Sequence, residues 1–230
     1  MDKKDAEGGR LVYKTFFSLV VLSGILLTAC GSGSVSENEN HENNKEETKE
    51  TTQNEEPASE EVDDVEGTLW EADGDIGIVL AHGAAYDADS WEEQGKEFAK
   101  ENKPAFAVED TSEGMLVDAA EMLKEEQEVQ EVAIVGASAG GASTIEAVET
   151  DETVFDKVVL LSPGGDATEI EEIPVLVIYS EEEGFDDLEE DQSDNLETLA
   201  LSGDAHAQEL FQDEEKSDKV MSEMIEFLDE

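Results

Sequence analysis

The stretch from Val132 to Gly141 constrains the fold of this chain more than any other. The apolar, β-branched run Val132–Val135 leads into Gly136-Ala137-Ser138-Ala139-Gly140, and the helix-favouring segment Ala142–Val148 follows. This order predicts a buried strand, a sharp turn with a serine at its apex, and a helix. Glycines suit such a strained turn because the helix must approach the strand closely. We therefore expect the Ser138 hydroxyl to be exposed at the edge of a sheet, near the free N–H groups of the next helix.

Strands and helices alternate along the rest of the globular part. Apolar runs predict strands, and apolar residues at helical spacing predict helices. The alternation predicts an α/β domain with a doubly wound, mostly parallel sheet that carries helices on both faces, and its sites should lie at the carboxyl ends of strands. The expected strands are 68–72, 76–81, 104–108, 158–161 and 174–179, and the expected helices are 90–101, 114–127 and 214–228, in one domain that spans 67–230.

The N-terminus has the pattern of an export signal. Lys3, Lys4 and Arg10 precede the apolar run 16–27, which is too short to span a bilayer comfortably. The following Leu27-Thr28-Ala29-Cys30 resembles the bacterial lipobox. We expect 1–29 to be a signal peptide outside the fold, and Cys30 to carry a lipid that holds the mature protein at the outer face of the bacterial cell membrane. The alternative is a signal anchor in which the cysteine occurs by chance.

Segment 30–66 is expected to be a disordered tether, because its Glu-, Asn- and Thr-rich composition provides almost no apolar side chains for a core. The whole chain is strongly acidic, with 63 acidic and 13 basic residues and a net charge of −50. A nucleic-acid partner is excluded, since binding phosphates needs a basic surface. Such self-repulsion favours an organism from saline surroundings, with an alkaline habitat as the alternative.

Four features along the domain resemble the α/β-hydrolase family. They are Leu80-Ala81-His82-Gly83, the GASAG turn around Ser138, the run Pro174–Glu183, and Gly203-Asp204-Ala205-His206. The resemblance covers roughly 76–227 and implies a serine nucleophile, an acid and a histidine in that chain order. Ser138, Glu183 and His206 obey the order.

The histidine follows partly by elimination. His41 lies in the tether, and the resemblance assigns His82 to the turn that shapes the oxyanion hole, so His206 remains as the base. The family's usual spacing past the strand implies Glu183 as the acid, with Asp186 as second choice.

The resemblance also implies an oxyanion hole made of the backbone N–H groups of Ala84 and Ala139. Tyr86 and Trp91 are candidates for the pocket wall, although packing is the commoner role of an aromatic residue beside a helix start. No metal or organic cofactor is expected, because the chain has neither a Cys/His cluster with metal spacing nor a Gly-rich phosphate loop.

The resemblance implies a serine hydrolase, and we expect a carboxylesterase. Only 163–173 separate two predicted strands where many lipases insert a lid, so an open site and small or short-acyl esters are expected. The alternatives are a non-catalytic binding lipoprotein with this fold and an acyl transferase.

Overall fold

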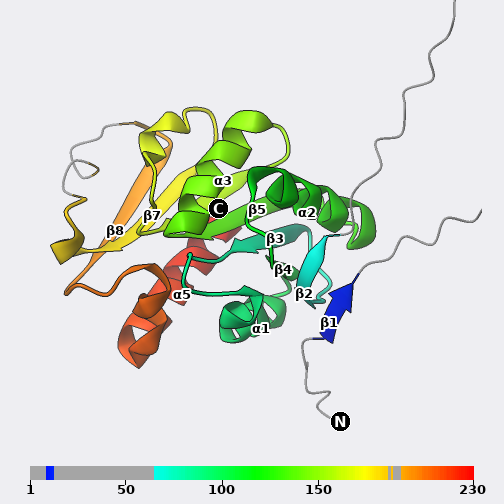
Figure 1. The fold of residues 1–230 in the computed structure, drawn as a ribbon, viewed down its shortest axis with the longest axis horizontal. Helices are drawn as coiled ribbons and strands as arrows, with labels where there is room; N and C mark the ends of the chain where they lie inside the picture. The colour runs from blue at the N-terminus through cyan, green and yellow to red at the C-terminus, as the bar shows by residue number, and fades with distance from the viewer. Residues whose placement is uncertain (1–8, 13–64, 186–187, 189–192) are drawn as a thin grey trace, which may run out of the picture. The chain divides into compact units, whose positions relative to one another are not determined.

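The computed structural model describes residues 9–12, 65–185, 188 and 193–230, which form one mixed sheet with helices on both faces (Figure 1). The strand order is β1-β2-β4-β3-β5-β6-β7-β8. From β4 to β8 all neighbouring strands are parallel, whereas β2 pairs antiparallel with β4 and with β1. The predicted α/β class, with a mostly parallel sheet, is confirmed. The strands are β1 Gly9–Val12, β2 Glu66–Trp70, β3 Ile76–Ala81, β4 Ala105–Val108, β5 Glu131–Ala137, β6 Lys157–Leu161, β7 Val175–Ser180 and β8 Leu196–Leu201.

Helices α2 and α3 cover one face of the sheet, and α1 and α5 cover the other (Figure 1). The α-helices are α1 Glu92–Lys100, α2 Glu113–Glu126, α3 Ala139–Thr150 and α5 Glu214–Asp229. Short 3₁₀ helices occupy several connections, namely η1 Ala88–Trp91, η2 Ala167–Glu169, η3 Glu181–Glu183 and η4 Ala207–Gln212. Two helical layers on one sheet give two hydrophobic cores.

The central strands are apolar on both faces because both faces are covered. In β3, Val79 packs into the core under α2 and α3, while its neighbours Ile78 and Leu80 pack into the core over α1 and α5. All three side chains are fully buried. The apolar run of β3 therefore serves both cores at once, which explains why the sequence shows no polar alternation there.

Two elements differ from the expected set. β8 was not predicted, because Leu196-Glu197-Thr198-Leu199 lacks the apolar/polar alternation of a strand, and the structure pairs it with β7. We also expected 1–29 to lie outside the fold, whereas Gly9–Val12 pairs with β2. Backbone pairing on an open edge does not need a particular side chain, so composition cannot exclude it. The assignment of 1–29 as a signal peptide stays a prediction.

Cys30 and His41 lie outside the described residues, as does nearly all of the expected tether. In the described part of the chain, no helix is both long and apolar enough to cross a membrane.

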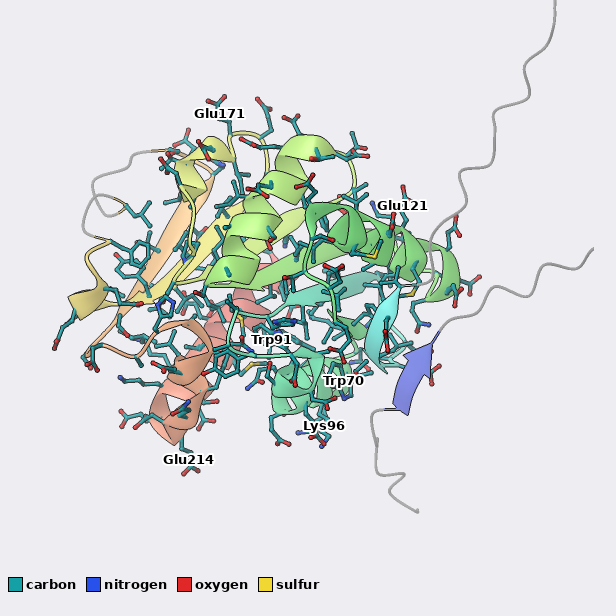
Figure 2. The ribbon with its side chains drawn as sticks, in the orientation of Figure 1. Trp70, Trp91, Lys96, Glu121, Glu171 and Glu214 are labelled. Atoms are coloured by element: carbon teal, nitrogen blue, oxygen red, sulfur yellow. The ribbon has the colours of Figure 1, made fainter. Side chains whose placement is uncertain are left out.

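Acidic side chains cover the surface of the domain. Glu121 on α2, Glu171 between β6 and β7, and Glu214 at the start of α5 point away from the fold, whereas Trp70 and Trp91 lie inside it (Figure 2). Some of the scarce lysines secure the end of α5. Lys157 Nζ donates to the carbonyl oxygens of Phe227 and Leu228, each at 3.0 Å, where free carbonyls at a helix C-terminus attract a cation. The buried Lys103 pairs with Asp229 at the same end.

Candidate active site

The predicted serine turn joins β5 to α3, and Ser138 lies at its apex with a left-handed φ of 49°. A non-glycine residue rarely adopts such a backbone, and it persists only where the surroundings enforce it. The two flanking glycines, Gly136 and Gly140, allow α3 to approach the strands closely. A β-carbon on Gly136 would lie 2.3 Å from Thr144 Oγ1, and one on Gly140 would lie 2.5 Å from the carbonyl oxygen of His82. The helix therefore packs directly on β5 and β3, and the serine hydroxyl stays accessible.

Ser138, His206 and Glu183 form one hydrogen-bonded chain. His206 Nε2 lies 2.8 Å from Ser138 Oγ, and His206 Nδ1 lies 2.5 Å from Glu183 Oε1. The three residues come from the ends of three strands, because Ser138 follows β5, Glu183 lies in the turn after β7, and His206 lies five residues beyond β8. The structure thus brings together the three side chains that the sequence selected, although 68 positions separate Ser138 from His206.

Glu183 is held by donors from two other residues. Its second oxygen, Oε2, accepts the Ser180 backbone N–H at 2.7 Å and the Ser162 hydroxyl at 2.7 Å. The side chain is 11% exposed, whereas Glu181 and Glu182 in the same turn are exposed. A carboxylate with several donors is fixed in orientation, so Oε1 faces the imidazole. The second-choice acid, Asp186, lies outside the described residues.

The turn after β3 lies on the other side of the serine. A β-carbon added to Gly83 would be 3.4 Å from Ser138 Cβ, so the turn is adjacent to the nucleophile. The Gly83 N–H donates to Gln208 Oε1 at 2.9 Å, and Gln208 Nε2 donates to Ser90 Oγ at 2.8 Å.

Ala84 and Ala139 are the predicted oxyanion donors. Both residues are exposed beside Ser138, and within the described residues neither N–H has an acceptor. Ala139 is the first residue of α3, where backbone N–H groups point out of the helix end. The two amides are therefore available to a ligand, as an oxyanion hole requires.

Solved structures with the same fold are numerous, although no protein-family model and no curated protein matches this sequence. A dienelactone hydrolase from Anabaena variabilis superimposes with a TM-score of 0.58 at 18% identity, over 71% of this chain and 90% of that one. A monoacylglycerol lipase from Paleococcus ferrophilus gives 0.58 at 14% identity, over 72% and 98%. An esterase from Exiguobacterium antarcticum gives 0.56 at 8% identity, over 72% and 97%. The chain has an α/β-hydrolase fold.

Within this α/β-hydrolase fold, three polar residues around the site were not selected from the sequence: Ser162, Ser180 and Gln208. Ser162 and Ser180 are fully buried, and Gln208 is 5% exposed. A local signal exists for the serines, because each is a polar residue at the carboxyl end of an apolar strand, where α/β folds place their sites. Gln208 offers no such signal, since its partner Gly83 is 125 positions away.

The site of this α/β-hydrolase fold is open. The His206 side chain is 52% exposed, and the connection between β6 and β7 contains only the short η2. A cavity of about 580 Å³ lies beside the β3 turn, with Tyr86, Gln208 and Phe211 in its wall. Trp91, by contrast, is fully buried and packs edge-on against Phe211 with ring centroids 6.0 Å apart, so it is a core residue and not a pocket contact.

The described residues contain no group of three or more His, Cys, Asp or Glu side chains that could hold a metal ion. A hydroxyl bonded to an imidazole, which is itself bonded to a fixed carboxylate, can lose its proton to that imidazole as it attacks an electrophile.

Proposed function

We propose that this protein is a membrane-tethered serine hydrolase, a carboxylesterase that acts on small or short-acyl esters. The observation that carries the proposal is the hydrogen-bonded chain Ser138–His206–Glu183 at the carboxyl ends of parallel strands, with two free backbone amides beside the serine. The names of similar structures agree with ester chemistry, since they include an esterase and a monoacylglycerol lipase.

The reaction proceeds through an acyl-enzyme. Ser138 Oγ attacks the ester carbonyl carbon while its proton moves to His206 Nε2, and the oxyanion that forms accepts hydrogen bonds from the N–H groups of Ala84 and Ala139. The leaving alcohol takes the proton from His206. Water then attacks the acyl group with His206 again as the base, and the acid and free Ser138 are released. Glu183 holds the imidazole in the productive tautomer throughout.

The proposed substrate size rests on the openness of the site. The short β6–β7 connection and the half-exposed His206 leave the serine without a lid on that side. A small ester therefore reaches the nucleophile without an opening motion, whereas interfacial hydrolysis of triglycerides is disfavoured.

The proposed location rests on the N-terminal sequence. A lipid on Cys30 would attach the mature protein to the outer face of the bacterial membrane, with 31–66 as the tether. Replacement of Cys30 by Ser should abolish incorporation of labelled palmitate and release the protein from the membrane fraction. Unchanged labelling in this variant would contradict the anchor.

The activity is tested on the full chain in high salt, with nitrophenyl acetate, butyrate and octanoate as substrates. We expect turnover that is fastest with the short acyl chains and that falls to the level of the uncatalysed reaction in Ser138→Ala. Ser143→Ala, on the next turn of α3, is the matched control and should keep full activity. Folded protein without turnover would contradict the proposal, and an added alcohol that captures most of the acyl group would indicate an acyl transferase.

A further inference from the structure

Ser162 lies immediately after β6, fully buried, with a left-handed φ of 41°. Glycine is the residue that adopts this backbone without strain, so a serine here carries a conformational cost. Residues in such conformations persist where the surroundings fix them, and they concentrate at functional sites. The backbone alone gives no reason for a serine at this position, and the reason must lie in its hydroxyl.

The hydroxyl connects two parts of the proposed triad. Ser162 Oγ donates to Glu183 Oε2 at 2.7 Å and accepts the backbone N–H of Ala207 at 3.1 Å. Ala207 directly follows His206, is buried, and itself has a left-handed φ of 50°. One oxygen therefore holds both the carboxylate and the chain segment that carries the imidazole.

The residues around Ser162 also hold the nucleophile turn. The carbonyl oxygen of Leu161 accepts the Ser138 N–H at 2.9 Å, and the Gly164 N–H donates to the Ser138 carbonyl oxygen at 2.9 Å. The segment 161–164 thus contacts the backbone of Ser138 on both sides of Ser162. The acid, the histidine segment and the serine turn all meet at the end of β6.

We infer that Ser162 is a positioning residue of the proposed hydrolase, whose hydroxyl sets the distance and orientation of Glu183 and His206 relative to Ser138. This inference rests on the proposed function. Ser162 does not touch a substrate or a reacting atom, so its loss should weaken the chemical step and leave substrate binding unchanged.

The decisive variant is Ser162→Gly, which removes the hydroxyl and at the same time relieves the backbone strain of the positive φ. We expect kcat for nitrophenyl butyrate to fall about 10- to 100-fold, as for one hydrogen bond to a charged group, with KM within about twofold. The melting temperature should fall only slightly, because the strain that glycine relieves at a positive φ offsets part of the loss of the acceptor for the buried Ala207 N–H. A residue with a merely structural role would lose activity only in proportion to the loss of folded protein.

Ser162→Thr provides the opposite change, since it keeps the hydroxyl and adds a branched β-carbon at a positive φ. We expect lower stability but a kcat closer to that of the intact protein than Ser162→Gly gives. The matched control is Glu128→Gly, an exposed left-handed residue (φ 55°) in the turn before β5, which should keep full kcat.

Full kcat in Ser162→Gly, measured beside an active intact protein, would overturn this inference alone. An equal loss in Glu128→Gly would also overturn it, because the effect would then come from the backbone change. Absence of turnover and of fluorophosphonate labelling in the intact protein would overturn the proposed function, and this inference with it.

Discussion

The two sides of Ser138 are built differently. On the acid side, Glu183 is held by a backbone amide from the end of β7, a hydroxyl from the end of β6 and the imidazole of His206. On the other side, in the turn after β3, the Gly83 N–H donates to the buried side chain of Gln208, and His82 Nε2 lies 3.3 Å from the Glu109 carbonyl oxygen. The Glu183 carboxylate thus has three partners from separate elements, whereas the Gly83 amide has one side-chain acceptor, Gln208.

The difference follows from what each side must hold. A charged carboxylate next to the core needs several donors, whereas a backbone amide needs one acceptor. Both sides nevertheless meet in one short segment, because Ala207 binds Ser162 and Gln208 binds Gly83. The residues that follow His206 therefore link the acid to the turn after β3. Variants of Glu183 and of Gln208 should lower kcat by different factors.

The largest effect is expected for Glu183→Gln. The amide cannot accept the His206 Nδ1–H at Oε1 and keep both donors at its other end, so the imidazole loses its fixed tautomer. We expect kcat to fall about 10³- to 10⁴-fold, as for the acid of other serine triads, with little change in the thermal unfolding midpoint. Asp186→Asn should keep kcat within a few-fold of the intact protein. A large loss of kcat in Asp186→Asn, with activity kept in Glu183→Gln, would identify Asp186 as the acid instead.

A smaller effect is expected for Gln208→Leu. The buried Gly83 N–H would lose its acceptor, which costs about 1–3 kcal/mol of folding free energy. The displaced turn should lower kcat about tenfold, less than the loss of a whole oxyanion donor. Gln208→Glu keeps an acceptor oxygen and should retain more activity. Equal kinetics of the two variants and the intact protein would show that the turn does not need this support.

The predictable part of the site is the part with a local sequence pattern. Ser138 lies in a strand–turn–helix segment that glycines mark, and His206 is one of only three histidines. The supports of these residues have no such pattern: Ser162 reaches Glu183 across 21 positions, and Gln208 reaches Gly83 across 125. Contacts of this kind depend on how the strand ends come together in space, which a single sequence does not specify.

Prediction of the fold from the sequence has the same limit. Strands buried on both faces were predicted because their apolar runs are continuous, as in β3 and β5. The edge strand β8 was missed because its exposed positions carry residues such as Glu197 and Thr198, which weaken the apolar signal. Edge strands obtain much of their stability from backbone pairing with a neighbour, and that pairing leaves little trace in composition.

Salt should affect the exposed carboxylates of the surface more than the largely buried Glu183. Between 0.1 and 2 M KCl we expect the unfolding midpoint to rise by more than about 5 °C, since screening relieves repulsion among exposed carboxylates. Turnover by folded protein should change less, because the contacts of Glu183 are largely buried. A flat midpoint over this range would contradict the salt dependence and favour an alkaline habitat as the origin of the charge.

The smallest effect is expected at Asp151, a partly exposed residue directly after α3 that is distant in role from Glu183. The Thr153 hydroxyl, followed by its backbone N–H, lowers the pKa of Asp151 below its usual 3.8. A lowered pKa in the folded state gives stability that is present above the unfolded pKa and is lost as the pH falls through the folded pKa.

Asp151→Asn should therefore lower the unfolding midpoint by less than about 2 °C at pH 7, as expected for a solvent-exposed charge. The difference from the intact protein should disappear in acid, and turnover should not change. A large midpoint shift would show that this turn supports the fold more than its exposure indicates.

The most direct test of the proposed triad is the site of reaction with a fluorophosphonate. Full-length protein should gain one adduct, and peptide mass analysis should place it on Ser138. Labelling should be slowed by orders of magnitude in His206→Asn and Glu183→Gln while both variants remain folded. An intact protein that does not label, or an adduct on another residue, would contradict the account that Ser138, His206 and Glu183 act together.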